Sequence, residues 1–450
     1  MKTIAGLLLW ALFSTTLLAQ NTIQSTTNGG HWNQTQTWVG GIVPTAADHV
    51  IINGPVEVGI NIACQNLTVN DTLTNDGSGC WSNRHLTVHG KLTNNGYIVN
   101  SPHYYCGGLR LILEGDLENN GSFSLHHLYF QGSANQTLST TTNNYLEASS
   151  EIVVDKTGGD LKAGSVLYLA ATLNLNEKAD LDMQNYDLHL QGSGRVMKGQ
   201  LNQVAGIHFG VGTSMGRSGE PFNLSGTHIH FYGSAMLGGD NHGHHQVHGD
   251  LTIHDTLTNN GDGCYNPGER HLVIHGNLTN NGIIRNSPHY YCGGLILEVT
   301  GNLDNQGDFE VKDLVLSGNQ PQNLSSANGK YLFSTNGISL DKTGGQLQAA
   351  SDLYLATTLN LDNQVDLDMQ QHALYLKGSG RPLKGRLLQA ADIYFSEGAH
   401  MGDYNEFIEI QGSDIHFYGK AIWGSSTTYD HIINGNLTIH DTLTSDDNSC

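Results

Sequence analysis

RHLTVHGKLTNNGYIVNSPHYYCGGL at residues 84–109 returns as RHLVIHGNLTNNGIIRNSPHYYCGGL at residues 270–295, with only five of 26 positions changed. The offset is 186 residues, and segments outside this block keep it: IHFYG begins at 229 and 415, and LTIHDTL begins at 251 and 437. Internal repetition on this scale is stronger evidence about the fold than any local motif.

A shorter repeat lies inside the long one. Runs that alternate apolar and polar residues begin about every 21 residues, nine to each long repeat, between turns rich in Asn, Gly, Asp and Ser. A unit this short cannot bury its own apolar face, so it must stack on its neighbours. The sequence shows no leucine-rich frame with a helical return. The pattern therefore predicts an all-β fold, a right-handed parallel β-helix (solenoid) with an N-terminal cap.

The start of the chain and its charge indicate where the protein works. Residues 1–19 have a basic start, an apolar core and Ala19 before the expected cut, as in a secretory signal peptide. No later stretch is apolar enough to cross a bilayer. The formal net charge of −21 argues against nucleic acid or an anionic membrane as partner. We expect a secreted or cell-surface protein without a membrane span, and a glycan or surface protein as partner.

The repeat divides the chain into five expected segments. Residues 20–30 read as a flexible leader, and the last copy stops at Cys450, which predicts an open last coil and a chain or gene cut short. The segments are a signal peptide (1–19), a leader and N-terminal cap (20–63), a first solenoid copy (64–247), a second copy (248–433) and the start of a third (434–450).

The segment 31–59 suits a cap, because two tryptophans and a run of β-branched residues can cover the first coil. Nine of its residues follow the pattern W-x-x-x-x-T-W-x-G-G-x-V-P-x-x-x-D-x-V-x-I, namely Trp32, Trp38, Gly40, Gly41, Val43, Pro44, Asp48, Val50 and Ile52. Ala47 departs from it, since Gly is usual there. The segment resembles the opening of many exported bacterial β-helix proteins, especially from Bacteroidetes, and overlaps the pattern of G8 domains. The resemblance implies architecture rather than activity, and such proteins often carry a C-terminal domain for type IX secretion.

Five of the six cysteines recur with the repeat: Cys80, Cys264 and Cys450 are equivalent, and so are Cys106 and Cys292. Within each full copy the two cysteines are about one coil apart. In an exported chain we expect disulfides between Cys80 and Cys106 and between Cys264 and Cys292. Adjacent coils lie about 4.8 Å apart, which is within the usual Cα separation of about 4.4–6.8 Å for a disulfide.

Cys64 stands apart from this set. Our alignment places it opposite His248 and Asn434, so it has no equivalent cysteine. It could be a buried thiol or pair with an unexpected partner.

The duplicated SPHYYCGG loop is the first candidate site. Its aromatic planes, next to an expected disulfide, could stack on sugar rings. The alternative is a loop folded over the coil with one tyrosine of each pair buried. The candidate ligand-binding residues are His103, Tyr104, Tyr105, His289, Tyr290 and Tyr291.

Two further groups could bind metals. The Asn-Gly turns could hold calcium, because Asn side chains and backbone carbonyls supply oxygen ligands. The alternative is structural: Asn and Gly accept the positive φ of tight turns, and stacked Asn side chains form ladders along a β-helix. The stretch GDNHGHHQVHGD offers imidazoles for zinc or copper, but its glycines give no fixed geometry, so a solvated loop is the favoured interpretation. The imidazoles belong to His242, His244, His245 and His248.

Acid/base catalysis would need a tight group of charged side chains on one face. The charged pairs beside Gly-Gly occur in both copies, as do Arg84 and Arg270. Their duplication argues against catalysis, because two equivalent active sites are unusual on one β-helix. The pairs are Asp155 with Lys156 and Asp341 with Lys342. No catalytic triad or phosphate-binding loop is visible, and no catalytic residue is assigned.

The favoured function is therefore an adhesin or structural scaffold with weak, multivalent glycan binding. Nine coils at about 4.8 Å would place equivalent patches roughly 43 Å apart on one side of the rod. The alternative is a carbohydrate-active β-helix enzyme, either a polysaccharide lyase or a glycoside hydrolase. A metal-binding surface protein is a third interpretation, which rests on the histidine stretch.

Overall fold

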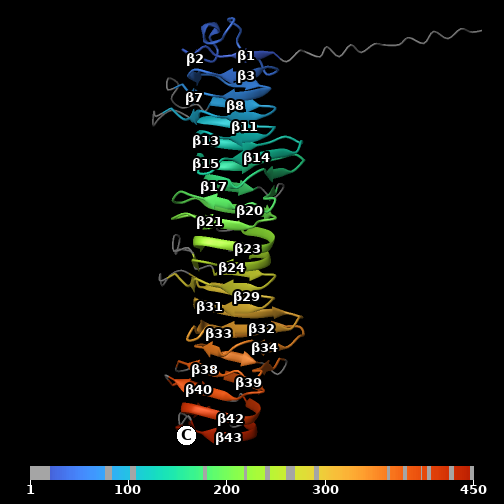
Figure 1. Ribbon diagram of the computed structural model, residues 1–450, viewed down its shortest axis with the longest axis vertical. Helices are drawn as coiled ribbons and strands as arrows, with labels where there is room; N and C mark the ends of the chain where they lie inside the picture. Colours follow the sequence, from blue (N-terminus) through green and yellow to red (C-terminus); the bar gives the residue numbers. More distant parts are fainter. Residues whose placement is uncertain are drawn as a thin grey trace, which may run out of the picture.

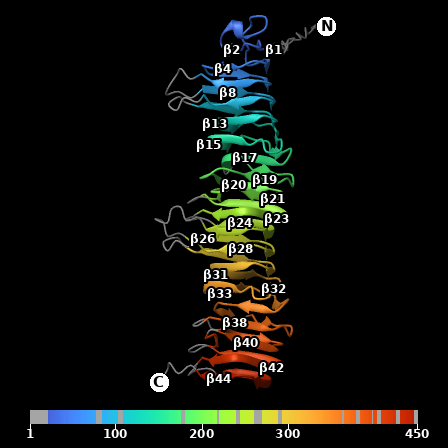
Figure 2. The same ribbon diagram turned by 60° about the vertical axis from the view of Figure 1, so that its left-hand side comes forward.

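The computed structural model describes residues 21–76, 84–101, 108–175, 180–216, 220–238, 244–259, 269–287, 293–361, 365–378, 383–396, 398–402, 407–424 and 430–445. These residues form 44 β-strands and one 3-10 helix, Thr35–Thr37, and the named strands pair in parallel as coils of one rod (Figures 1 and 2). The predicted parallel β-solenoid is confirmed. In this part of the chain no helix has the length and hydrophobicity to cross a membrane.

The strands stack in three columns, and each coil runs from column 1 through column 2 to column 3. Column 1 contains β1 (Thr22–Gln24), β3 (His49–Ile52), β6 (Asn66–Val69), β9 (Leu92–Asn94), β12 (Leu117–Asn119), β14 (Gln136–Thr140), β16 (Leu161–Ala163), β18 (Leu181–Asp182), β26 (Arg270–Ile274), β29 (Leu295–Val299), β36 (Leu359–Leu361), β41 (His400–Met401) and β44 (Thr442–Ser445). Column 2 contains β2 (Gly30–His31), β4 (Val56–Val58), β7 (Thr72–Asn75), β10 (Tyr97–Val99), β19 (Leu188–Leu190), β21 (Gly206–Phe209), β27 (Leu278–Asn280), β30 (Leu303–Asn305), β32 (Gln322–Ser326), β34 (Leu347–Ala349) and β37 (Leu367–Asp368).

Column 3 contains β5 (Ile62–Cys64), β8 (Arg84–Val88), β11 (Leu109–Leu113), β22 (Ser214–Met215), β25 (Thr256–Asn259), β28 (Ile283–Arg285), β35 (Leu353–Leu355), β38 (Leu374–Lys377) and β40 (Asp392–Ser396). Longer strands turn a corner and belong to more than one column: β13 (Ser122–Phe130), β15 (Leu146–Val154), β17 (Leu167–Leu175), β20 (Val196–Asn202), β23 (Phe222–Leu237), β24 (His245–Ile253), β31 (Asp308–Gly318), β33 (Leu332–Lys342), β39 (Leu383–Leu388), β42 (Ile408–Trp423) and β43 (Ile432–Ile439).

The long repeat does not contain nine coils. From β6, the pairing passes through β9, β12, β14, β16, β18, β20 and β23 to the first part of β24, which is eight coils. Column 1 therefore reaches Val247, which pairs with Leu224, after eight coils. The sequence equivalent of Leu67, however, is Leu251, which lies in column 2 and pairs with Leu278. One repeat is therefore eight coils and one further strand, and the nine-coil prediction was wrong.

Equivalent strands nevertheless return to the same side of the rod. In both views β13 and β31, which are equivalent, lie toward one side, and Figure 1 places β14 and β32 together on the opposite side. Because equivalent strands lie in different columns, this arrangement means that the columns wind around the axis, as twisted sheets do. Equivalent surfaces therefore face one direction, roughly 40 Å apart along the axis at about 4.8 Å per coil.

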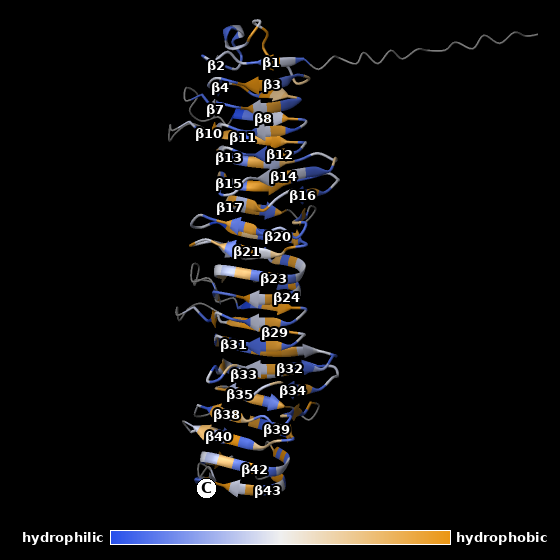
Figure 3. Cartoon of the chain, in the orientation of Figure 1, coloured by the Kyte–Doolittle hydropathy of each residue, from blue (hydrophilic) through white to orange (hydrophobic). Residues whose placement is uncertain are grey.

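Apolar side chains fill the interior of the solenoid. Along column 3, Leu86, Leu111, Leu128 and Ile152 are successive partners, and each is at most 1% exposed. Figure 3 shows the resulting alternation of hydrophobic and hydrophilic residues along the strands. Each fully buried leucine or isoleucine contributes about 1.5–3 kcal/mol, so stacked coils supply the stability that one coil lacks.

The Asn-Gly turns contain asparagine ladders. Asn94 is fully buried, and its amide donates to Asn119 Oδ1 at 2.7 Å, while the Asn280 amide donates to Asn305 Oδ1 at 2.8 Å. The Asn94 and Asn280 side-chain oxygens also accept the N–H groups of Gly96 and Gly282. These amides therefore hold neighbouring turns together inside the rod.

The N-terminal segment closes the first coil, with its loop above β1 and β3 (Figure 1). Trp32 and Trp38 are 1% and 2% exposed, their rings meet edge to face at 5.0 Å, and Trp38 Nε1 donates to the Trp32 carbonyl at 2.7 Å. Their predicted burial is confirmed. Gly40 and Gly41 allow the turn that follows, because both have positive φ, at 84° and 71°. Residues 22–24 differ from the expected leader, since β1 already pairs with β3.

Cys64 occupies an interior column position rather than the one our alignment assigned. It pairs with Val88, whose repeat equivalent Ile274 pairs with Val247, so the residue equivalent to Cys64 is Val247 and not His248. The side chain is fully buried and its thiol is free, and burial raises its pKa to about 12. Cys64 therefore serves as a small apolar side chain in the core.

Candidate functional site

Each SPHYYCGG loop grows from a stem that two asparagines close. Asn75 Oδ1 accepts the N–H of Ser101 at 2.7 Å, and Asn100 Oδ1 accepts the N–H of Leu109 at 2.9 Å. The second of these bonds joins the two sides of the loop across nine residues, while Asn75 ties the loop to the coil before it. The stem is therefore anchored to the rod at both ends.

The second copy repeats this stem with the same chemistry. Asn259 Oδ1 accepts the N–H of Ser287, and Asn286 Oδ1 accepts the N–H of Leu295 at 2.8 Å. Asn259 also donates to the Gly293 carbonyl at 2.7 Å. Beyond these stems, six candidate ligand-binding residues lie outside the described residues: His103, Tyr104, Tyr105, His289, Tyr290 and Tyr291. Their role stays a prediction.

The four cysteines of the expected disulfides also lie outside the described residues, so their pairing stays a prediction, but the strands that flank them are in register. β7 pairs with β10 and β8 with β11, so the strands before and after residues 77–83 are register partners of the strands before and after residues 102–107. β25 with β28 and β26 with β29 repeat this arrangement in the second copy.

We expect non-reduced peptide mapping of the purified chain to recover Cys80 joined to Cys106 and Cys264 joined to Cys292, because the strands that flank each expected pair are register partners on neighbouring coils. The buried Cys64 thiol should become alkylated only after denaturation. Recovery of the four cysteines as free thiols from an oxidised preparation would contradict the pairing.

A second duplicated feature is a ladder of stacked aromatic rings on the outside of the rod. Its members are register partners on successive coils, so ring lies on ring. The first ladder, in column 2, comprises Tyr145, Tyr168, His189, His208, Tyr232 and His254. The second ladder, in column 3, comprises Tyr331, Tyr354, Tyr375, Tyr394, Tyr418 and His440, each 186 residues later.

Ring geometry determines what the ladders can offer a ligand. Apart from the first, edge-to-face contact of each ladder, centroid distances are 3.9–4.6 Å in the first ladder and 4.3–4.6 Å in the second. Because stacked rings cover each other's faces, the partly exposed members of the ladders present ring edges and polar ring atoms to solvent, whereas Tyr168 and Tyr354 are buried. Burial and the neighbouring Tyr354 and Tyr394 raise the pKa of Tyr375 to about 12. The ladders are therefore rows of polar edges rather than planes for a sugar.

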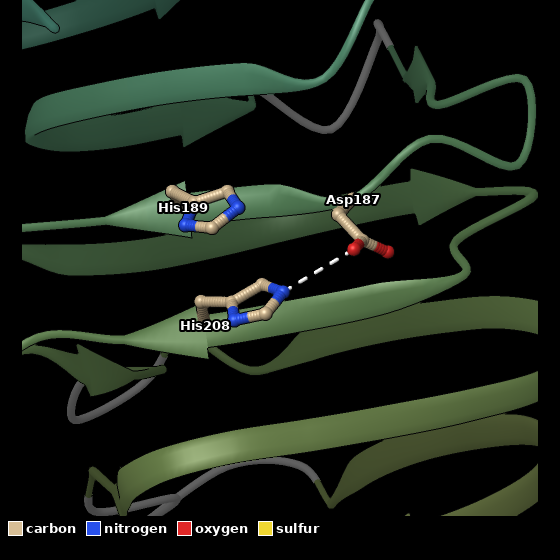
Figure 4. Close-up of side chains that lie close together, drawn as sticks. All are labelled: Asp187, His189 and His208. Atoms are coloured by element: carbon tan, nitrogen blue, oxygen red, sulfur yellow. Dashed lines mark hydrogen bonds and ion pairs between the residues drawn. The ribbon is translucent and has the colours of Figure 1, made fainter. Parts of the chain in front are cut away.

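The centre of the first ladder holds a group that the second lacks. The side chains of Asp187, His189 and His208 converge, and His208 Nε2 lies 3.2 Å from Asp187 Oδ2 (Figure 4). A groove of about 460 Å³ runs beside the two imidazoles, with Val211, which is 91% exposed, on its lining. Burial and the neighbouring His208 lower the pKa of His189. All three side chains are partly exposed and open to solvent.

The histidines of the 239–250 stretch have separate surroundings. His245 is fully buried, with Nδ1 accepting the Phe222 N–H at 3.3 Å and Nε2 facing the Gly238 carbonyl at 3.0 Å. His431 has the same contacts in the second copy, with Ile408 and Gly424. His248 stacks on His275 at 4.5 Å, and the His244 ring lies 4.0 Å from that of His271. His242 lies outside the described residues.

The recurring charged pairs bridge coils rather than form a charged face. Lys156 is 5% exposed and donates to the Ala134 carbonyl and Gln136 Oε1, and Lys342 makes the same bonds to Gln320 and Gln322. Burial lowers the pKa of both lysines.

The two arginines also sit against the coils. Arg84 pairs with Asp76 at 3.2 Å, beside the loop that carries Cys80, and Arg270 is 3% exposed. Asp155 is exposed beside the buried Lys156. These lysines and arginines therefore have structural contacts that account for their recurrence.

Our reading of the sequence missed both ladders. The available signal was a Tyr or His at one outward position per coil, as in LYL, LHL, IHF and HFYG. Neighbouring rings are 19–24 residues apart, with varying steps, so the ladder becomes recognisable only once the strand register is known.

No family model matches this chain, and comparisons with curated proteins and with solved structures find no match. The resemblance of segment 31–59 to exported bacterial β-helix proteins therefore stays a prediction, and function rests on the geometry described above.

Proposed function

We propose that this chain is a secreted or cell-surface adhesin or structural scaffold, which presents two equivalent loop sites for weak glycan binding. One observation carries the proposal: two loops of nearly identical sequence have the same asparagine-closed stem. Because equivalent strands return to the same side of the rod, both stems face one direction, roughly 40 Å apart.

A stem fixed at both ends favours ligand binding by the loop that it carries. A loop held at both ends loses less conformational entropy when it binds, so even a shallow contact can retain a sugar. Two such sites on a rigid rod engage a polymeric glycan together, and avidity can exceed the single-site affinity by about 10²–10⁴. Each loop contributes His103, Tyr104 and Tyr105 or their equivalents His289, Tyr290 and Tyr291.

Glycan arrays and surface-immobilised glycan titrations test this proposal. We expect Tyr104→Ala and Tyr290→Ala each to weaken binding to the immobilised glycan at least about tenfold through lost avidity, and the double variant to abolish it. Tyr186→Ala is the matched control, because Tyr186 is 39% exposed and belongs to neither loop. Undiminished binding by a folded double variant would remove the loops from the site.

The stems supply a second comparison. Asn100→Ala with Asn286→Ala should weaken binding while keeping every loop ring, whereas Asn100→Asp with Asn286→Asp should restore it, because a carboxylate still accepts the Leu109 and Leu295 N–H groups. Equal binding by the alanine and aspartate variants would show that the stems do not position the loops.

The alternative of a carbohydrate-active enzyme is tested with the same preparation. Release of unsaturated sugars from pectin-like polymers, without retention of the glycan, would favour a polysaccharide lyase over an adhesin.

A further inference from the structure

The two aromatic ladders differ at their centres in a coordinated way. The two end rings on each side are identical in type, but His189 and His208 of the first ladder correspond to Tyr375 and Tyr394 of the second. The neighbouring Asp187 corresponds to Ala373. Asp187, His189 and His208, three side chains that could ligate a metal, are thus replaced together in the second copy, while the stack itself persists at 4.4 Å.

These three side chains already lie within reach of one another. One ligand atom from each side chain lies within 4.8 Å of the other two. Among the described residues, this is the group of three or more His, Cys, Asp or Glu side chains whose ligand atoms lie that close together. Asp187 comes from the turn before β19, His189 from β19 and His208 from β21, which are paired strands (Figure 4). The register of the solenoid therefore holds the group in place.

The chemistry of the set favours a first-row transition metal. Imidazole nitrogen and carboxylate oxygen suit Zn²⁺ and Cu²⁺, with ligand bonds of about 2.0–2.2 Å, and three protein ligands leave one position for water. The groove beside His189 and His208 leaves that position accessible from solvent.

Binding requires a change in the stack. The His189 and His208 rings are parallel within 3°, at 3.9 Å, so their lone pairs lie in separate parallel planes and do not converge on one point. His208 Nε2 already faces Asp187, so one of the two rings must leave the stack for both imidazoles and the carboxylate to bind one ion. If His208 turns, it also leaves Tyr232, on which it stacks at 4.5 Å.

We propose that Asp187, His189 and His208 form a Zn²⁺-binding site on the first ladder, which the second ladder lacks. Binding opens the stack between His208 and its neighbours. The proposal does not depend on glycan binding by the loops.

Isothermal titration with ZnCl₂ on the whole chain tests the site. The variant Asp187→Ala/His189→Tyr/His208→Tyr reproduces the residues of the second ladder, a geometry that this fold already accommodates. We expect its zinc Kd to rise by at least about a hundredfold, since even loss of outer-shell partners costs about 10–100-fold. The reverse variant Ala373→Asp/Tyr375→His/Tyr394→His should gain a second zinc equivalent.

Two readouts separate this site from other histidines. Near-UV circular dichroism of the ladder tyrosines should change with zinc in the wild type and stay constant in the triple variant. The control His242→Gln/His244→Gln/His248→Gln should keep the wild-type zinc affinity. The proposal would be overturned if Asp187→Ala/His189→Tyr/His208→Tyr still bound zinc with wild-type affinity, or if His242→Gln/His244→Gln/His248→Gln lost zinc binding.

Discussion

Lowering the pH from 7 to 4 is expected to destabilise the coils around His245 by roughly 3 kcal/mol, because burial lowers the pKa of this imidazole from 6.5 to about 4. The unfolded chain then binds a proton that the folded chain excludes. Stability is therefore complete above pH 6.5 and is lost as the pH falls toward 4. The contacts give the reason: Nδ1 already accepts the Phe222 N–H, so a proton there would place two donors face to face.

Urea unfolding of the wild type and His245→Gln at several pH values checks this expectation. The wild type should be the more stable protein at pH 7, and its advantage should shrink between pH 6.5 and pH 4. The protection factor of the Phe222 amide, which is its hydrogen-exchange rate corrected for the intrinsic pH dependence, should fall over the same range in the wild type. A stability difference that is constant from pH 7 to pH 4 would contradict the assignment of the acid sensitivity to His245.

Replacing Lys156 with Met is expected to lower the free energy of unfolding by about 2 kcal/mol. Met keeps the aliphatic volume but leaves the Ala134 carbonyl and Gln136 Oε1, which accept from Nζ at 2.8 and 2.6 Å, without this donor. Part of that loss is offset, because the variant no longer buries a charge. Lys342→Met should cost a similar amount, and the two losses should add because the sites share no contacts.

Lys162→Met is the matched control for this comparison. Lys162 is 40% exposed and pairs with Asp160 at 3.3 Å, so its loss should change stability by less than about 0.5 kcal/mol. Urea titration of the three single variants and the Lys156→Met/Lys342→Met pair gives all four values. If Lys156→Met were as stable as the control, the buried bridge would contribute nothing.

Local sequence predicted burial correctly where the type of a residue and its immediate pattern are enough to determine whether its side chain is buried. The alternating leucines predicted strands with one buried face, and Leu86 and its stacking partners occupy the core. Trp32 and Trp38 predicted a cap and are buried in it. The turn asparagines were considered for calcium and for ladders, and Asn94 and Asn280 form ladders. In each case burial follows from the residue type and its immediate pattern.

The sequence by itself determined that this protein is a parallel solenoid with duplicated surface features. Units of about 21 residues cannot bury their own apolar faces and must stack, and the 186-residue repeat duplicates whatever the stacked units expose. Only the tertiary structure decided the number of coils, since a continuous strand such as β23 turns two corners at the single glycines Gly226 and Gly233, without the longer turns that separate other strands. It also decided that Cys64 matches Val247 and that His245 is buried. The group of Asp187, His189 and His208 depends on the same cause, because contacts between coils of variable length are set by strand register and not by spacing along the chain.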